Sequence, residues 1–460
     1  MSAQISSPAP GAVVALLKRL HFYVGLFVGP FLLVAALSGV LYALTPQIEE
    51  HLYADALHSG SRGPNLTLAE QVGIAQAQIG NARLTVAAVR PAPKAGDTTR
   101  VMFSAPTLGE SENRAVFIDP VSGAVRGDMT VYGTSGVLPL RTWIDQFHRG
   151  LLLGDVGRLY SELAASWLWV AVLGGLVLWA VNRARARPGA RSLRGWHASA
   201  GLWLALGLLF FSATGLTWSQ YAGDNIGVLR AWYGWSTPSV ATSLGHASSM
   251  PASMKMPMDE HAEHHMHMAA HGAPVALDAA LFDSVLSSAR SAGIDAAKVE
   301  IRPAKSADTA WVVNEIDRRW PTHVDAVAVD PQSLKVIDQV RFAQYSLPAK
   351  LTRWGIDAHM GALFGLANQL LLVAFASGLA VMVVLGYLMW WRRRPTLAPQ
   401  LTLFDAWRQM APVGRLGVIA VAVAVGICLP VLGVSLLCFV VGDVLSSMRA
   451  SPNVLSQTRA

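Results

Sequence analysis

The sequence contains few charged residues and almost no cysteine. Charged residues make up 14% of its 460 positions and hydrophobic residues 53%, which favours a membrane protein over several soluble domains. Its two cysteines, Cys428 and Cys438, lie in one late apolar stretch, so no disulfide framework supports a domain outside the membrane. The sequence also lacks a dinucleotide-binding glycine motif, a Walker loop and a Ser-His-Asp arrangement. A redox role would therefore need a partner or a membrane quinol as electron donor.

Five stretches are long and apolar enough to cross a bilayer, which takes about 20 residues of helix. They cover about residues 20–45, 163–182, 198–220, 360–391 and 416–442. Basic residues gather at alternate ends of these stretches, at 18–19, 183–194 and 392–394, and such clusters mark the cytoplasmic side. The net charge of +7 therefore needs no nucleic acid as a partner. This topology places both long connections outside, together with the tail that follows Asp443.

A motif of histidine and glycine occurs twice. In each copy a histidine is followed by glycine four positions later, and then by a hydroxyl residue and a second glycine. The copies are His21, Gly25, Ser38 and Gly39 and, 176 positions on, His197, Gly201, Thr214 and Gly215. Eighteen residues make five α-helical turns and rise about 27 Å. In each copy, we therefore expect the histidine and the second glycine to lie on one face of the helix, at opposite edges of the membrane.

A second motif, His-x-Gly-x-Leu-x-Gly, repeats with a different spacing. It starts at His148 and again at His359, 211 positions later. The same spacing relates Asp119-Pro120 to Asp330-Pro331, and each pair ends a strand pattern at a turn. Each long connection therefore predicts a small α+β domain.

The spacing also locates an insertion. A capping-box pattern at Thr67 and Glu70 precedes a helical run, and Asp278 takes the corresponding place in the second copy. Because the offset grows from 176 to 211 positions, the second copy holds 35 extra residues between Gly215 and Asp278.

The predicted fold is an α-helical membrane bundle of five helices in a tandem parallel repeat, with two small α+β domains outside. Its order is cytoplasmic tail 1–18, helix 19–45, external domain 46–157, helix 158–183, cytoplasmic loop 184–194, helix 195–220, external domain 221–358 with the insertion at about 237–277, helix 359–391, cytoplasmic loop 392–412, helix 413–442 and tail 443–460. We expect this chain in a bacterial inner membrane, with both large domains in the periplasm.

Parallel repeats are related by an axis along the membrane normal. His21 and His197 should then share one depth near the inner face, and His148 and His359 one depth near the outer face. Low-spin haem takes two axial imidazoles, so each pair suits one haem. The motif glycines would leave room for a flat macrocycle against the backbone.

Each of these features also has a simpler explanation. A single histidine at a helix end is commonly an interfacial or hydrogen-bonded residue. Glycine pairs are common in membrane helices because they let helices approach closely. The recurrence of four histidines in two registers, with matched glycines, favours ligation.

The inserted segment is rich in methionine and histidine. Its candidate metal-binding residues are Met254, Met256, Met258, His261, His264, His265, Met266, His267, Met268 and His271. Thioether and imidazole groups suit soft metals such as Cu(I), which predicts metal capture outside the membrane. A flexible insertion without a specific role explains the same composition.

Together these motifs resemble the PepSY-associated transmembrane family, also described as iron-regulated membrane proteins. The resemblance covers the chain to about residue 445 and rests on Arg19-Leu-His21-Phe-Tyr-Val-Gly25-Leu26, Ser38-Gly39, Thr214-Gly215, Arg149-Gly-Leu-Leu-Leu-Gly154-Asp-Val-Gly157-Arg158 and the turn Asp119-Pro-Val-Ser-Gly123. The second turn, Asp330-Pro-Gln-Ser-Leu334, lacks the glycine. The family includes inner-membrane siderophore reductases with two haems on helix histidines. The resemblance implies ligand roles for His21, His148, His197 and His359.

The motifs and the resemblance predict an electron-transfer protein with two b-type haems, each bound by two histidines. It would reduce a ferric siderophore, or another oxidised metal such as copper, in the periplasm, and its donor would be a quinol or a cytoplasmic reductase. The Met/His insertion is not part of the family pattern, and it admits copper as the substrate. The alternative is a non-redox module anchored in the bilayer, whose external domains bind a periplasmic protein or a metal.

Overall fold

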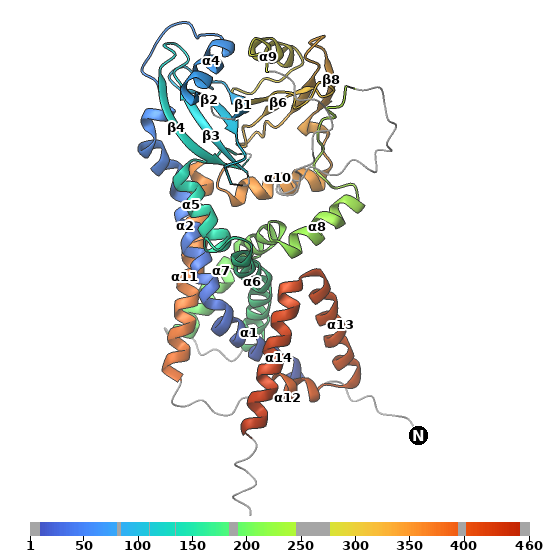
Figure 1. Cartoon of the computed structure of the whole chain (residues 1–460). Helices are drawn as coiled ribbons and strands as arrows, with labels where there is room; N and C mark the ends of the chain where they lie inside the picture. Colours follow the sequence, from blue (N-terminus) through green and yellow to red (C-terminus); the bar gives the residue numbers. More distant parts are fainter. Residues whose placement is uncertain are drawn as a thin grey trace, which may run out of the picture. The chain divides into compact units, whose positions relative to one another are not determined.

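The computed structural model describes residues 10–80, 84–109, 111–133, 135–183, 192–244, 277–393 and 402–450, with side chains to 445 at the C-terminal end. Its contacts divide the chain into two units, which are drawn with their element labels in Figure 1. The helical unit contains Met1–Leu41, Gln146–Val228 and Leu370–Ala460, and the sheet unit contains Tyr42–Asp145 and Leu229–Gln369.

Within the described ranges, four helical spans are long and apolar enough to cross a membrane. The first runs over Gly11–Leu52 and consists of α1 (Pro10–Tyr23), the π-helix η1 (Val24–Val28) and α2 (Gly29–Leu52). The others are α6 (Gly154–Asn182), α7 (Leu193–Thr217) and α11 (Leu366–Arg393). These candidate spans cover the first four stretches that the sequence predicted to cross. Their shared core includes Val24, Val28, Trp167, Leu208 and Leu379.

The last apolar stretch is not one helix, so the prediction of a single crossing over 413–442 is wrong. It folds into α13 (Pro412–Cys428) and α14 (Pro430–Ala450), which lie side by side (Figure 1). Proline has no N–H and disfavours helical backbone in the residue before it, and Leu429 leaves the helical region with ψ near 80°. Gly426 and Gly433 then let the helices meet, since a Cβ on Gly433 would lie 2.8 Å from Gly426 Cα.

This C-terminal hairpin, α13 and α14, returns the chain to the end of the helical unit where α1 begins. Asp443 of α14 accepts a hydrogen bond from the backbone N–H of Leu403 in α12 (Leu403–Arg408), at 2.6 Å, and forms an ion pair with Arg19 of α1. The prediction that the tail after Asp443 lies outside assumed a single helix over 413–442, whereas this stretch forms two helices.

The sheet unit contains one antiparallel sheet of eight strands, in the order β4-β3-β2-β1-β5-β6-β7-β8. The first copy contributes β1 (Thr85–Arg90), β2 (Thr99–Ser104), β3 (Glu112–Ile118) and β4 (Val125–Tyr132). The second copy contributes β5 (Val299–Arg302), β6 (Trp311–Glu315), β7 (Ala326–Val329) and β8 (Val336–Val340). Each copy is a four-stranded antiparallel meander, because its strands pair in the order in which they follow along the chain.

The two predicted external domains are therefore joined into one structure. Strands β1 and β5 pair across the seam, with Val89 opposite Ile301. An edge strand leaves a row of unpaired N–H and C=O groups, and pairing the two edges satisfies both at once. The sequence predicted each copy correctly as an α+β unit but did not predict that the two units share one sheet.

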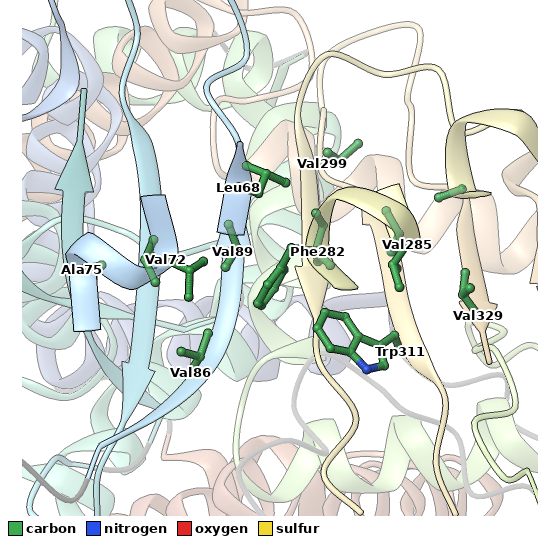
Figure 2. Packing of buried hydrophobic residues seen from close by; sticks show 14 of the residues in the cluster. Leu68, Val72, Ala75, Val86, Val89, Phe282, Val285, Val299, Trp311 and Val329 are labelled. Atoms are coloured by element: carbon green, nitrogen blue, oxygen red, sulfur yellow. The ribbon is translucent and has the colours of Figure 1, made fainter. Parts of the chain in front are cut away.

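The core of the sheet unit also combines both copies. Helices α4 (Leu68–Ile79) and α9 (Leu281–Ser291) lie on the same side of the sheet (Figure 1). Figure 2 shows Leu68 and Val72 of one copy in the same buried cluster as Phe282 and Trp311 of the other. The rings of Phe282 and Trp311 meet edge to face, with centroids 4.7 Å apart.

Helix α4 begins as the sequence predicted. Thr67 Oγ1 accepts from the N–H of Glu70 at 3.2 Å, and the Thr67 N–H donates to the Glu70 carboxylate at 2.8 Å. Asp278 does not cap α9 in the same way, because it binds the N–H of Ala280, one residue before that helix.

The remaining helices are short. They are α3 (Ala54–Leu57), α5 (Pro139–Gly150), α8 (Tyr221–Trp232), α10 (Leu347–His359) and the 3-10 turn η5 (Phe342–Gln344). Of these, α5 and α10 carry the second pair of predicted histidines.

Candidate functional site

The helical unit brings His21 and His197 together. His21 lies at the end of α1 and His197 near the start of α7, and their ring centroids are 6.4 Å apart at an interplanar angle of 82°. The two histidines are 176 positions apart in the sequence and come from the two copies of the first motif.

Both rings are oriented by the same type of hydrogen bond. The Nδ1 of His21 lies 3.1 Å from the carbonyl oxygen of Ala171 in α6. The Nδ1 of His197 lies 3.1 Å from the carbonyl oxygen of Met382 in α11. Only a protonated Nδ1 can donate to a carbonyl, so each bond selects the tautomer in which Nε2 carries a lone pair. This is the arrangement in which a histidine ligates a metal.

The carbonyl partners follow the repeat as closely as the histidines do. Ala171 and Met382 are 211 positions apart, the offset of the second motif. Sequence reasoning missed both, because a backbone acceptor leaves no trace in side-chain patterns. The 211-position offset relates α6 to α11, so applying it to these helices would have paired the two carbonyl positions.

The separation of the rings fits two imidazoles on one metal ion. Two metal–nitrogen bonds of about 2 Å each, with the distance from each Nε2 to its ring centre, give a centroid separation of about 6 Å. The residues present therefore fit the axial ligand set of a low-spin haem. His21 and His197 would hold the group, and the carbonyls of Ala171 and Met382 would fix the two rings.

Glycines lie around these rings, although not all are the predicted ones. A Cβ on Gly175 of α6 would lie 3.3 Å from His21 Cε1, so glycine lets this helix approach the ring. Its repeat counterpart, Gly386, has open space around it, as does the predicted Gly25. A Cβ on Gly201 would meet the end of the Met382 side chain at 3.1 Å.

The first span is not a regular α-helix, which corrects one step of the sequence argument. The shared face of His21 and Gly39 assumed 3.6 residues per turn throughout. Residues Val24–Val28 form a π-helix directly after Tyr23, and the wider turn changes the rotation between the two positions. In α7 the described helix runs from Leu193 to Thr217 without such a turn, so His197 and Gly215 keep the predicted relation.

His148 contacts the second half of the first motif. Its Nδ1 lies 2.9 Å from Ser38 Oγ, and a Cβ on Gly39 would lie 3.4 Å from its Cε1. Ser38 donates its own proton to the carbonyl of Val34 at 2.7 Å, so the hydroxyl can accept from Nδ1. The Ser-Gly pair of the motif thus has a physical role beside this histidine: the serine orients the ring and the glycine makes room for it.

The remaining first-motif residues pack as helix contacts. Thr214 donates back to the carbonyl of Phe210 at 2.7 Å, as Ser38 does to Val34. A Cβ on Gly215 would lie 3.3 Å from the Cβ of Ala165 in α6.

His359 is the last residue of α10, in the sheet unit. Two residues earlier, Asp357 is fully buried and accepts from Arg353 Nε at 3.0 Å. The pairing of His359 with His148 stays a prediction from the repeat.

The Met/His segment lies outside the described residues, with all ten of its candidate ligands. Within the described ranges, no three or more His, Cys, Asp or Glu side chains gather into a metal-binding group. His21 and His197, called the inner pair below, would offer two imidazole ligands to a metal-containing group.

The fold defines a helical membrane protein with four candidate spans and an antiparallel sheet. The family model for the PepSY-associated TM region matches residues 18–393, and the chain therefore belongs to this family. A comparison with curated proteins finds no match. The matched region contains all four repeated histidines and ends before the C-terminal hairpin.

Proposed function

We propose that this protein transfers electrons across a bacterial inner membrane through two b-type haems. We further propose that it reduces a ferric chelate of the siderophore type, or another oxidised metal such as copper, on the periplasmic side. The observation that carries the proposal is the inner pair. His21 and His197 are 6.4 Å apart, and each Nδ1 lies on a carbonyl at a repeat-related position.

When bound, haem supplies a one-electron carrier, and this chain's residues decide how it is held. The hydrogen bonds from Nδ1 to Ala171 and Met382 make each imidazole a stronger donor through Nε2. Stronger donation stabilises the more positive, oxidised state of a metal. The inner site is therefore suited to passing its electron onward.

A second site near the other end of the helices would complete the route. Ser38 orients the ring of His148 through Nδ1, and in the proposed site its Nε2 would be the ligating nitrogen. We assign His148 and His359 to this second site on the strength of the repeat. The electron donor on the inner side would be a quinol or a cytoplasmic reductase.

The reaction at the outer end transfers one electron to Fe(III) and forms Fe(II). Oxygen-donor chelates prefer the harder, more highly charged ion, so reduction weakens their hold and releases the metal. The Met/His segment would favour Cu(I) in the same chemistry, because Cu(II) also accepts one electron and thioethers bind the product.

The test uses the purified full-length protein from haem-replete cells. A b-type spectrum after reduction, with about two haems per chain, is expected from two bis-histidine sites. The reduced protein should then be reoxidised by a ferric siderophore, which is followed as loss of the reduced band. A colourless protein would contradict the proposal and favour the non-redox, membrane-anchored binding module.

A further inference from the structure

Asp443 is a buried carboxylate in the C-terminal hairpin, with 2% of its surface exposed. It accepts a hydrogen bond from the Tyr23 hydroxyl and lies 3.4 Å from both Nε and Nη2 of Arg19. It also accepts from the backbone N–H of Leu403 at 2.6 Å. One side chain thus connects α14, α12 and α1. A buried charge is costly unless it is paired and hydrogen-bonded, so this carboxylate strongly prefers the arrangement in which all these donors surround it.

The two donors from α1 lie on either side of His21. Arg19 and Tyr23 are four positions apart, so they share one face of the helix, and the Arg19 guanidinium lies 4.5 Å from the Tyr23 ring centre. His21 is two positions from each and therefore points to the opposite face. When Asp443 holds the first face, it fixes the rotation of α1 that aims His21 at α6 and His197.

The second copy lacks the two side chains that make this contact. At the 176 offset, Arg19 corresponds to Gly195 and Tyr23 to Ser199. Gly195 has no side chain, and Ser199 is exposed and has only a short hydroxyl, so this copy has neither the guanidinium nor the phenol. The π-helix that follows Tyr23 also has no counterpart in α7. The carboxylate therefore acts on one of the two inner histidines.

The hairpin is anchored independently of Asp443. Trp167 Nε1 of α6 donates to Ser435 Oγ at 2.8 Å, and Asn225 of α8 donates to the carbonyls of Ile427 and Cys428 at 3.2 and 3.1 Å. These bonds can thus hold the hairpin in place when Asp443 is substituted.

We propose that Asp443 is a positioning residue for the inner histidine pair. It holds α1 through Arg19 and Tyr23, so that His21 keeps its bond to Ala171 and faces His197. This inference deepens the proposed function and rests on it for the role of the pair. It assigns a task to a segment that lies beyond the family match.

The variant Asp443→Asn removes the charge and keeps the shape. Loss of an outer-shell partner that binds a ligand directly typically weakens metal binding by about 10- to 100-fold. Asp443 contacts Arg19 and Tyr23 rather than His21 itself, so its effect should be smaller. We expect the inner haem of this variant to transfer to apomyoglobin up to about tenfold faster, and its spectrum to change, while the outer haem keeps its rate. Asp443→Glu should restore part of the loss. Asn225→Ala removes two hydrogen bonds near the turn of the hairpin but leaves the bond between Trp167 and Ser435, so it should leave the inner haem unchanged. Unchanged transfer in Asp443→Asn would overturn the proposal.

A second measurement works whether or not haem is bound. Hydrogen–deuterium exchange of residues 15–24 should be faster in Asp443→Asn than in the wild type, and exchange of 193–202 should stay the same. If residues 15–24 exchanged at the same rate in Asp443→Asn and in the wild type, the positioning role of Asp443 would be overturned. A colourless wild type would overturn only the proposed function. If Asp443→Asn fails to fold, Tyr23→Phe removes a single hydrogen bond and should change transfer and exchange in the same direction, to a smaller extent.

Discussion

The two copies of the repeat share the hydrogen bonds of the inner site but differ in what surrounds it. His21 binds the Ala171 carbonyl and His197 the Met382 carbonyl, both at 3.1 Å. The first copy adds a π-helix after Tyr23 and a buried carboxylate on the opposite helix face. Two histidines with the same local geometry can therefore differ in how firmly they are held. The feature common to both copies is thus the position of the hydrogen-bond donor and of its carbonyl acceptor.

The sheet unit has the same relation between its copies. The turns after β3 and β7 use equivalent bonds, in which Asp119 accepts from Ser122 at 2.6 Å and Asp330 from Ser333 at 2.5 Å. The seam between the copies is not symmetric. The first copy contributes Arg90 to a buried ion pair and the second contributes Glu300.

The largest effect should come from removing either inner histidine. If one haem lies between the copies, His21→Ala and His197→Ala should each lower the haem content from about two to about one per chain. Their spectra should be the same, because each variant loses the same group. Haem content by pyridine haemochrome and the reduced spectrum are the measurements.

The matched control for this comparison is His51→Ala. His51 is exposed near the end of α2 and lies outside both motifs, so this variant should keep both haems. His148→Ala should remove the other haem. If His21→Ala and His197→Ala lost different haems, each copy would hold its own haem and the pairing across copies would be wrong.

The next prediction concerns topology and has an all-or-none readout. The C-terminal hairpin returns the chain to the end where α1 begins, and the basic residues Lys18 and Arg19 predict that this end is cytoplasmic. A reporter that is active only in the cytoplasm should therefore be active when fused at residue 455. A fusion at residue 60, in the first long connection, should be inactive. Activity in a periplasmic reporter at 455 would mean that α13 and α14 do not form a hairpin in the membrane.

The part of this fold that could be predicted follows from local sequence patterns. The four spans follow from charge-free runs of sufficient length, and the capping box at Thr67 is complete within four residues. The repeat offsets alone were enough to pair His21 with His197. Pro430 was a visible signal for the break in the last apolar run, but the uniform hydropathy on both sides of it favoured one helix.

Other features depend on contacts that leave no local pattern. The pairing of β1 with β5 joins strands that are more than 200 positions apart, and either edge alone fits a small separate domain. The contact of Arg19 with Asp443 spans 424 positions. Neither side chain is unusual in its own segment, because arginine at the end of a span is ordinary membrane anchoring.

Removing the charge of Glu300 at the seam between the copies should cause a large loss of stability. Glu300 is 2% exposed, and Arg90 Nη2 lies 2.5 Å from its Oε2, while Arg302 Nε lies 2.7 Å from Oε1. Glu300→Gln leaves two guanidinium groups without their counter-charge, and breaking a buried pair in this way costs about 3–5 kcal/mol. Thermal unfolding of the full chain, followed by the signal of the sheet, should show the loss. Asp128→Asn breaks the more exposed pair with Arg114 and should cost less than about 1 kcal/mol.

The pH dependence of the seam has a definite sign. Burial alone would raise the pKa of Glu300, but Arg90 and Arg302 outweigh burial, and the net direction is downward. A lowered pKa means that the folded state favours the carboxylate. Its contribution is therefore complete above the unfolded pKa of about 4.3 and is lost as the pH falls through the lower, folded pKa. The difference between wild type and Glu300→Gln should be constant near neutrality and shrink only in acid. A difference that grew on acidification would contradict this assignment.

The smallest expected effect tests the last position of the two turns, where the first copy has glycine and the second has leucine. Gly123 has φ of 73° and Leu334, its counterpart, has φ of 55°, so a leucine occupies a backbone conformation that suits glycine. The left-handed region costs a non-glycine residue about 1–2 kcal/mol, and glycine loses about 0.5–1 kcal/mol more in backbone entropy on folding. Leu334→Gly should therefore raise the free energy of unfolding by roughly 0.5 kcal/mol, since the leucine side chain is exposed and little packing is lost.

Leu334→Ala is the matched control: it removes the side chain and keeps the Cβ, so it should give no gain. The reverse change, Gly123→Ala, should be clearly destabilising, because its Cβ would also lie 2.8 Å from Ile74 Cδ1. If Leu334→Gly and Leu334→Ala changed stability equally, the backbone of the second turn would carry no strain, and the two turns would differ in sequence alone.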